Sequence, residues 1–158
     1  MFRFDLRPAA ITSLALATAL ATAFGLSQLD GAARADTPTA SVSRAADGHY
    51  WAHADIDGAP VRLLVDTGAS LVTLSREDAR RMGIEVPETA FTTHLTTASG
   101  SLPAAPVRLK SVTVGGARVE NVLALVVDAD MPASLLGMSY LGRLNRFEAG
   151  PAGLTFSG

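Results

Sequence analysis

Short apolar runs separated by glycine-containing turns are the feature that most limits how this chain can fold. Asp57-Gly58 separates the runs 50–56 and 61–65, and Gly115-Gly116 precedes the strongly apolar stretch 117–127. Two β-rich runs on either side of such a dipeptide predict a hairpin. Many short strands of this kind predict an all-β fold, a small closed or partly closed barrel, with one or two short helices.

Two segments carry helix signals. Ser75 is a good N-cap, Asp78 lies three residues later near the positive end of the helix dipole, and Gly83 ends the segment. The segment 138–144 predicts a further turn or two of helix. Between them, 90–97 is rich in threonine, 97–101 has turn chemistry and 107–109 resumes a strand, which predicts a long hairpin with a small, flexible tip.

The composition limits the classes of function. The chain has 158 residues, of which 48% are hydrophobic and 18% charged, which suits one domain with an apolar core. The net charge is -2 and no run of basic residues stands out, so we expect no nucleic-acid partner. There are no cysteines, which excludes thiol nucleophiles, disulfides and thiolate metal sites.

The N-terminal 35 residues differ from the rest. Arg3 and Arg7 flank the start, the stretch 8–29 has no charged residue, and Ala33-Arg34-Ala35 offers small residues where a signal peptidase reads. This pattern predicts a secretory signal cleaved near Ala35. The alternative is an uncleaved anchor in the inner membrane, because 8–29 is just long enough to span a bilayer.

Under both interpretations the remainder of the chain is exported, so we expect a periplasmic protein, either soluble or held at the membrane. Residues 36–46 are small and polar, which predicts a linker. The sequence therefore divides into a signal peptide or anchor at 1–35, a linker at 36–46 and a folded domain at 47–158.

An acidic residue directly after an apolar run makes 63–68 the segment with the most potential for a functional site. Leu63-Leu64-Val65 precedes Asp66-Thr67-Gly68. A carboxylate carried into the interior by such a strand must be hydrogen-bonded, paired or neutralised, because burying a lone charge is costly. Gly68 lets the backbone turn sharply and bring amides close to that carboxylate.

This segment resembles the active-site loop of the retropepsin-like branch of the aspartic proteases, and the chain looks like the single-domain members of bacterial envelopes. A second landmark is the apolar-apolar-Gly strand that packs against the catalytic loop in this family, here Leu135, Leu136 and Gly137. The resemblance covers nearly all of 48–158. It implies a small barrel of the acid protease type, with a flap hairpin tipped by Ala98, Ser99 and Gly100.

The resemblance also implies an activity. Asp66 would be catalytic, in a loop completed by Thr67, Gly68, Ala69 and Ser70. Only one such loop is present, so two copies of the chain would each supply one Asp66, and water activated between the carboxylates would hydrolyse a peptide bond. Thr67 would link the two loops. Ser70 departs from the acidic residue common in retroviral members. No metal or cofactor is implied.

Other interpretations of these residues remain open. Asp66 is also compatible with a structural turn, in an envelope β-domain without a functional groove, and the fold is compatible with a peptide-binding or scaffolding module without turnover. His49 and His53 share a strand face and, with Asp55 or Asp57, are potential metal ligands. Ser70 or Ser99 with His94 and an aspartate is a potential hydrolase triad, although no Gly-x-Ser-x-Gly motif is present.

Overall fold

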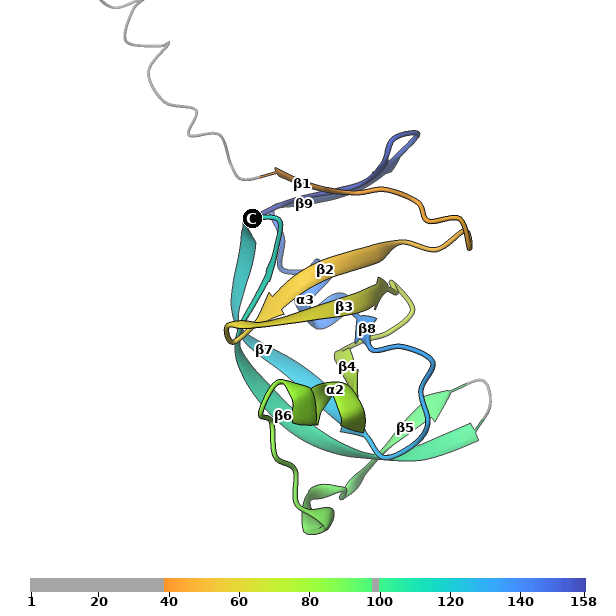
Figure 1. The fold of residues 1–158 in the computed structure, drawn as a ribbon, viewed down its shortest axis with the longest axis vertical. Coiled ribbons are helices and arrows are strands. Elements are labelled where there is room, and N and C mark those ends of the chain that lie inside the picture. The colour runs from red at the N-terminus through yellow and green to blue at the C-terminus, as the bar shows by residue number, and fades with distance from the viewer. Residues whose placement is uncertain (1–38, 98–99) are drawn as a thin grey trace, which may run out of the picture. The chain divides into compact units, whose positions relative to one another are not determined.

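The computed structural model describes residues 39–97 and 100–158, which form a mostly β domain with two short α-helices (Figure 1). The strands are β1 Thr39–Val42, β2 Trp51–Ile56, β3 Ala59–Val65, β4 Val72–Ser75, β5 Thr93–Thr97, β6 Gly100–Val114, β7 Ala117–Val127, β8 Leu135–Leu136, β9 Arg146–Gly150 and β10 Gly153–Ser157. The helices are α2 Arg76–Arg81 and α3 Met138–Leu141, with a 3-10 turn η1 at Glu88–Ala90. The all-β expectation is confirmed.

Seven strands form one sheet that closes on itself. Their order is β2-β3-β8-β4-β7-β6-β5, and β2 also pairs with β6 through Ala54↔Val114 and Ile56↔Val112. This extra pairing joins the two sides of the sheet into a barrel, which confirms the predicted architecture. β5 extends beyond the ring and pairs with β6 (Figure 1).

The predicted hairpins form at the predicted turns. Asp57 has φ 55° and Gly58 has φ 91°, so both central residues of the β2–β3 turn are left-handed, as a two-residue turn between right-twisted strands requires. The two carboxylate oxygens of Asp57 accept the N–H groups of Lys110 at 3.2 Å and Ser111 at 2.7 Å. Asp57 is therefore used to attach the hairpin tip to β6.

A second, three-stranded sheet has the order β1-β10-β9. Its strand β1 falls within 36–46, the segment that we expected to be a linker, and it pairs with β10 from Thr39↔Ser157 to Val42↔Leu154. The linker assignment is wrong for these residues. Small residues allow the pairing: Gly115 approaches β1 so closely that a Cβ on it would lie 2.3 Å from that of Ala40.

One hydrophobic core fills the barrel and extends under the second sheet. Its largest fully buried side chains are Tyr140, Phe156, Ile56, Leu63, Leu74, Leu109 and Leu136. They come from both sheets and from α3, and Phe156 stacks on Phe147 with ring centroids 5.4 Å apart. A smaller cluster of Ala104, Leu125 and Val127 lies near the β5–β6 hairpin.

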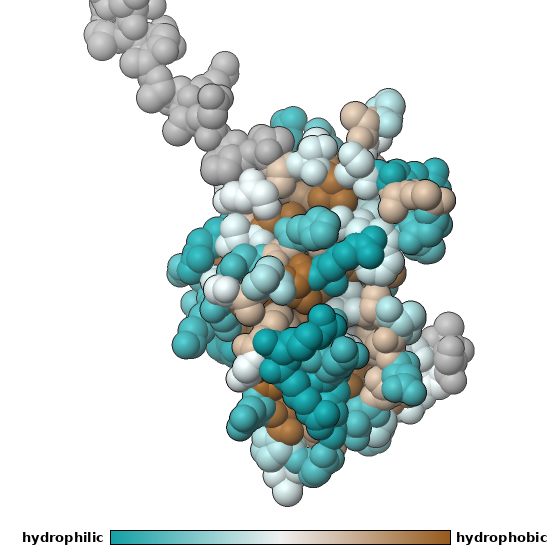
Figure 2. All heavy atoms as spheres, in the orientation of Figure 1, coloured by the Kyte–Doolittle hydropathy of each residue, from teal (hydrophilic) through white to brown (hydrophobic). Residues whose placement is uncertain are grey.

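Helix α2 confirms the predicted capping. The Ser75 hydroxyl accepts the N–H of Asp78 at 3.0 Å, and Gly83 follows the helix with φ 74°. Five of its six residues are charged, and Figure 2 shows a hydrophilic patch over this part of the surface. Its exposed face is therefore solvated, while Ala79 packs into the core.

The signal or anchor assigned to 1–35 lies outside the described residues. Within 39–97 and 100–158, no helix is long and apolar enough to cross a membrane.

Candidate active site

Asp66 follows strand β3 at the point where the chain leaves the barrel wall. Its backbone N–H donates to the carbonyl of Leu136 at 3.2 Å, which attaches the start of the loop to β8. The N–H of Ala69 donates back to the Asp66 carbonyl at 3.3 Å and closes a tight turn. The loop therefore begins from a fixed point on the sheet.

The carboxylate of Asp66 is half-buried and turned back over its own loop. Its Oδ1 accepts the N–H of Gly68 at 2.8 Å. A Cβ at position 68 would lie 3.1 Å from that same oxygen, so a side chain there would push against the carboxylate. Gly68 thus keeps the amide close enough to orient Asp66.

Gly137 fits beneath the loop because it lacks a side chain. A Cβ at this position would lie 2.2 Å from the carbonyl oxygen of Leu71 and 2.7 Å from that of Ala69. The next residue, Met138, donates its N–H to the Ala69 carbonyl at 2.8 Å. The apolar-apolar-Gly segment is therefore in direct backbone contact with the Asp66 loop.

The loop's far end is held by α3. The hydroxyl of Ser139 accepts the N–H of Val72 at 2.9 Å and donates to the carbonyl of Leu123 at 2.7 Å. These bonds attach the start of β4 to both α3 and β7. Both ends of the loop are thus fixed by residues distant in sequence.

A cavity of about 520 Å³ is lined by this loop and by the β5–β6 hairpin side of the barrel. Its lining residues are Asp66, Gly68, Ala69, Ser70, Leu71, Leu95, Thr96, Thr97, Leu125 and Leu135. Aliphatic side chains form its walls, and Asp66 is the only acidic residue among these lining residues. Such a cavity can hold an apolar side chain of a ligand while a carboxylate faces its backbone.

The predicted site residues are only partly brought together. Asp66, Gly68, Ala69 and Ser70 share the cavity with Leu135, whereas Leu136 and Gly137 support it from beneath. Thr67 is exposed and is not among the lining residues. Gly100 begins β6 with φ 131°, and Ala98 and Ser99 lie outside the described residues.

The base of the β5–β6 hairpin is attached to α2 through Arg76. Its Nη1 lies 2.6 Å from Oε1 of Glu88, and its Nε lies 3.1 Å from Oδ1 of Asp128. The guanidinium also covers the ring of Phe91 at 4.3 Å. The hydrogen bond between Arg76 and Glu88 raises the pKa of Arg76 and lowers the pKa of Glu88.

The alternative sites gain no geometric support. His94 is not among the residues that line the cavity with Ser70. No group of three or more His, Asp or Glu side chains within 39–97 and 100–158 is arranged to hold a metal ion. His49 instead lies beside Asp47, whose oxygens accept the backbone N–H of His49 and the indole N–H of Trp51.

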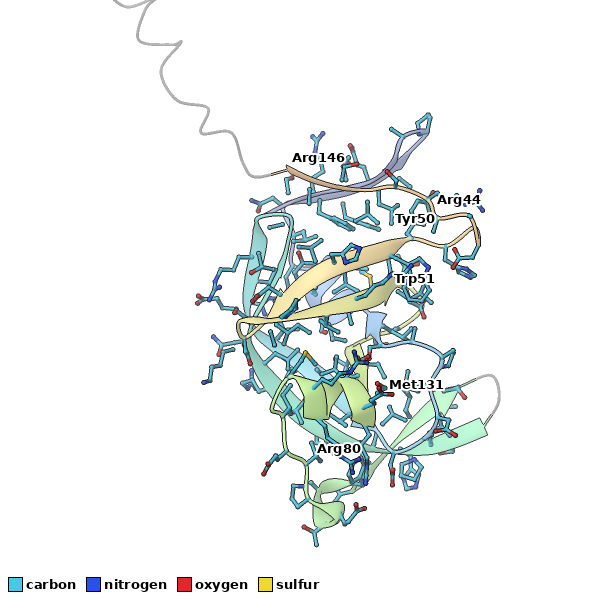
Figure 3. All side chains as sticks on the ribbon, in the orientation of Figure 1. Arg44, Tyr50, Trp51, Arg80, Met131 and Arg146 are labelled. Atoms are coloured by element: carbon cyan, nitrogen blue, oxygen red, sulfur yellow. The ribbon has the colours of Figure 1, made fainter. Side chains whose placement is uncertain are left out.

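A second hollow, of about 640 Å³, lies between α2 and the segment 128–131. Arg80 and Met131, labelled in Figure 3, are among the residues that line it. Its other lining residues are largely charged, and none of them belongs to the Asp66 loop.

A family comparison matches residues 52–143, more than half of the chain, to the family described as "gag-polyprotein putative aspartyl protease". The matched span contains both Asp66 and Gly137. The chain belongs to the retropepsin-like aspartic protease family.

One solved structure agrees with this membership, and a second shares the fold. A retropepsin-like aspartic protease from Rickettsia conorii is 34% identical, with a TM-score of 0.67, covering 75% of this chain and 89% of that chain. The EIAV protease complexed with the inhibitor HBY-793 is 20% identical, with a TM-score of 0.53, covering 64% of this chain and 92% of that chain. The second likeness shows the fold alone.

Curated relatives of this retropepsin-like chain are longer proteins. An uncharacterized protein of Rickettsia prowazekii is 36% identical over 106 residues, which are 67% of this chain and 46% of the relative. An uncharacterized protein encoded in the cobV 5' region of a Sinorhizobium species is 37% identical over 103 residues, which are 65% of this chain and 44% of the relative. The chain thus spans less than half the length of these relatives.

Two residues of this retropepsin-like domain form a contact behind the loop's support that the sequence did not predict. Ser134 directly precedes Leu135, is fully buried, and its hydroxyl donates to Asp78 at 2.5 Å. Asp78 was identified only as a residue of the helix N-terminus. A serine just before an apolar-apolar-Gly strand is a weak signal, because serine is equally common in exposed turns.

Proposed function

We propose that the chain is an aspartic endopeptidase, which hydrolyses peptide bonds with water activated between the Asp66 carboxylates of two copies. The observation that carries this proposal is the placement of Asp66, which is half-buried, oriented by the Gly68 N–H at 2.8 Å and open to an aliphatic cavity of about 520 Å³. A structural turn aspartate does not need such a cavity.

The need for a second copy follows from the chemistry. One carboxylate cannot act both as general base toward water and as general acid toward the leaving amine in a single step. Among the described residues that line the cavity, Asp66 is the only acid. A homodimer supplies the second Asp66 by symmetry.

In the proposed dimer the two carboxylates share one proton, because like charges about 3 Å apart do not both ionise. The ionised Asp66 takes a proton from the water that attacks the scissile carbonyl. The protonated Asp66 stabilises the developing oxyanion and then protonates the leaving nitrogen.

The test is cleavage of a mixed, denatured protein substrate by the 158-residue chain, with Asp66→Asn beside it and Asp130→Asn as the matched control. Asp130 is exposed and lines the other hollow, so its loss leaves the proposed dyad intact. We expect wild type and Asp130→Asn to cleave and Asp66→Asn to lose more than about 10³-fold in rate. Equal cleavage by Asp66→Asn would overturn the proposal.

Subunit mixing tests the dimer separately. Specific activity should rise with enzyme concentration and then level, and excess Asp66→Asn should inhibit wild type by forming mixed dimers. Activity that is linear at all concentrations and unaffected by Asp66→Asn would contradict the shared dyad. Peptide binding without turnover at any pH would instead support a catalytically silent binding module.

We further propose that the enzyme is exported and works in the periplasm, either released by cleavage near Ala35 or held at the inner membrane through 8–29. The support is the sequence pattern of the first 35 residues. Cell fractionation followed by N-terminal sequencing of the mature protein tests it. A protein that starts at Asp36 in the soluble periplasmic fraction would establish cleavage, whereas an intact N-terminus in the membrane fraction would establish the anchor.

A further inference from the structure

Ser134 is the central residue of a buried polar network behind the Asp66 loop. Its hydroxyl accepts the backbone N–H of Ser75 at 2.9 Å and donates to Oδ2 of Asp78 at 2.5 Å. Its carbonyl accepts the N–H of Leu64 at 2.9 Å. One fully buried residue therefore connects β3, the end of β4 and α2.

Both carboxylate oxygens of Asp78 in this network have partners. Asp78 is 9% exposed, and its second oxygen, Oδ1, lies 2.6 Å from Nη2 of Arg81. Its backbone N–H donates to the hydroxyl of Ser75 at 3.0 Å. The first turn of α2 is thus fixed against Ser134. A buried network in which the hydroxyl and both carboxylate oxygens are paired is rigid.

Strand β8 needs such a restraint because it is only two residues long. It pairs in parallel with β3 through Leu64↔Leu135 and Val65↔Leu136, and antiparallel with β4 through Thr73↔Leu135. Figure 1 shows it lying between the ends of these two strands. A ladder this short has few hydrogen bonds of its own to hold its register.

The register of β8 determines the position of Asp66. In the observed register the Leu136 carbonyl accepts the Asp66 N–H, and Gly137 lies beneath the loop. A slip by one residue would bring Met138 to that position, where a Cβ would meet the Leu71 carbonyl at 2.2 Å. The loop would then have to move away from β8.

We propose that Ser134 and Asp78 are positioning residues that fix the register of β8 and thereby the placement of the Asp66 carboxylate. This inference rests on the proposed function, because the two residues act on catalysis through Asp66. Neither lines the cavity, so they do not contact substrate in this scheme.

The first test is Ser134→Ala in the 158-residue chain. The change leaves the N–H of Ser75 and the carboxylate of Asp78 without their buried partner. We expect kcat to fall about 10-fold or more with KM changed less than about twofold, because a displaced catalytic group costs rate rather than substrate binding. We also expect the amides of Asp66 and Met138 to exchange hydrogen at least about 10-fold faster, with Val122 in β7 nearly unchanged.

Tyr140→Phe is the matched control. Its hydroxyl makes one buried hydrogen bond, to the carbonyl of Ala117 at 2.8 Å, at the turn between β6 and β7. Removing it also leaves a buried hydrogen-bond partner unsatisfied, and this partner lies outside the network around β8. If Tyr140→Phe lowers kcat as much as Ser134→Ala, the effect is general destabilisation and the inference is overturned.

Asp78→Asn keeps the inference testable if Ser134→Ala does not fold. The amide retains one acceptor oxygen, so we expect a loss in kcat of about threefold, and Arg81→Gln, which removes an exposed partner, should change kcat less than about twofold. Unchanged kcat and unchanged amide exchange in Asp78→Asn would refute the positioning role.

Amide exchange separates this inference from the proposed function. If wild type shows no cleavage, the proposed function fails, but faster exchange at Asp66 and Met138 in Ser134→Ala still establishes that Ser134 fixes the loop. If wild type cleaves and Ser134→Ala leaves both kcat and these amides unchanged, only the positioning role fails.

Discussion

The two walls of the cavity differ in how the fold holds them. The Asp66 wall is connected by backbone hydrogen bonds to β8, through Leu136, and to α3, through Met138. The opposite wall includes Leu95 and Thr96 on β5, the last strand in the order of the seven-stranded sheet, which pairs with β6. One wall is enclosed by the barrel, and the other is an edge.

This difference matches what the proposed hydrolysis requires of each wall. A catalytic carboxylate must be held within about 0.5 Å of its productive position, which requires contacts from several elements. A wall that admits a peptide has to open, and elements with few buried contacts open at the lowest free energy. In the proposed enzyme, positioning and access therefore belong to different walls, and Arg76 connects the segment that leads into β5 to α2 through its ion pair with Glu88.

The largest effect expected is that of Gly137→Ala, which introduces a steric clash in the enclosed wall. The new Cβ would lie 2.2 Å from backbone oxygen, which cannot move without displacing the loop, so we expect a loss of about 3 kcal/mol or more in unfolding free energy. Urea unfolding measures it. Gly150→Ala, whose Cβ would meet nothing closer than 3.9 Å, is the control and should change stability by less than about 1 kcal/mol. Equal stability of the two variants would show that the Asp66 wall is not tightly enclosed.

A pair of identical truncations sharpens the comparison of the walls. Leu125 is 8% exposed and belongs to the cluster near the β5–β6 hairpin, so Leu125→Ala should cost about 3 kcal/mol. Leu95 is only half-buried on the edge strand, so Leu95→Ala should cost about 1 kcal/mol while raising KM. Similar costs at both positions in chemical unfolding would argue that β5 is as firmly packed as the barrel.

Alkaline pH tests the burial of Tyr140, whose hydroxyl lies at the turn between β6 and β7. Burial raises the pKa of Tyr140 in α3 to about 12, from 10.0. Since the folded state keeps this proton longer than the unfolded state, the stability it contributes is present below pH 10 and is lost as pH rises toward 12. We expect wild type to lose about 1 to 2 kcal/mol more than Tyr140→Phe over this range, measured by urea unfolding at each pH. Parallel losses would mean that Tyr140 ionises as freely in the fold as outside it.

Acidic pH tests the base of the edge wall and should give the smallest effect. The hydrogen bond from Arg76 lowers the pKa of Glu88 below 4.5, so this pair contributes stability above 4.5 that is lost as pH falls through the lowered pKa. Wild type should therefore show a steeper fall in Tm than Glu88→Gln below about pH 5. High salt should remove the difference, because Glu88 is exposed. A steeper fall in the variant would reverse the assigned direction.

Local patterns predicted much of the fold because their causes lie within a few residues. The Asp57-Gly58 and Gly115-Gly116 turns, the Ser75 cap and the Asp66-Thr67-Gly68 turn each depend on neighbouring backbone geometry. The strand β1 was missed because its small, polar sequence becomes a strand only when β10 supplies the partner edge. The same holds for Ser134, whose role depends on Asp78, which lies 56 residues away.

The sequence by itself determined the β-rich fold, the turns and the carboxylate that we propose to be catalytic, because alternation, glycine and a carboxylate after an apolar run act locally. Only the tertiary structure decided why position 137 must be glycine, which side chains form the cavity with Asp66, and which buried network holds β8 in register. These features depend on contacts between segments that are far apart in the chain, and such contacts form only when the barrel closes.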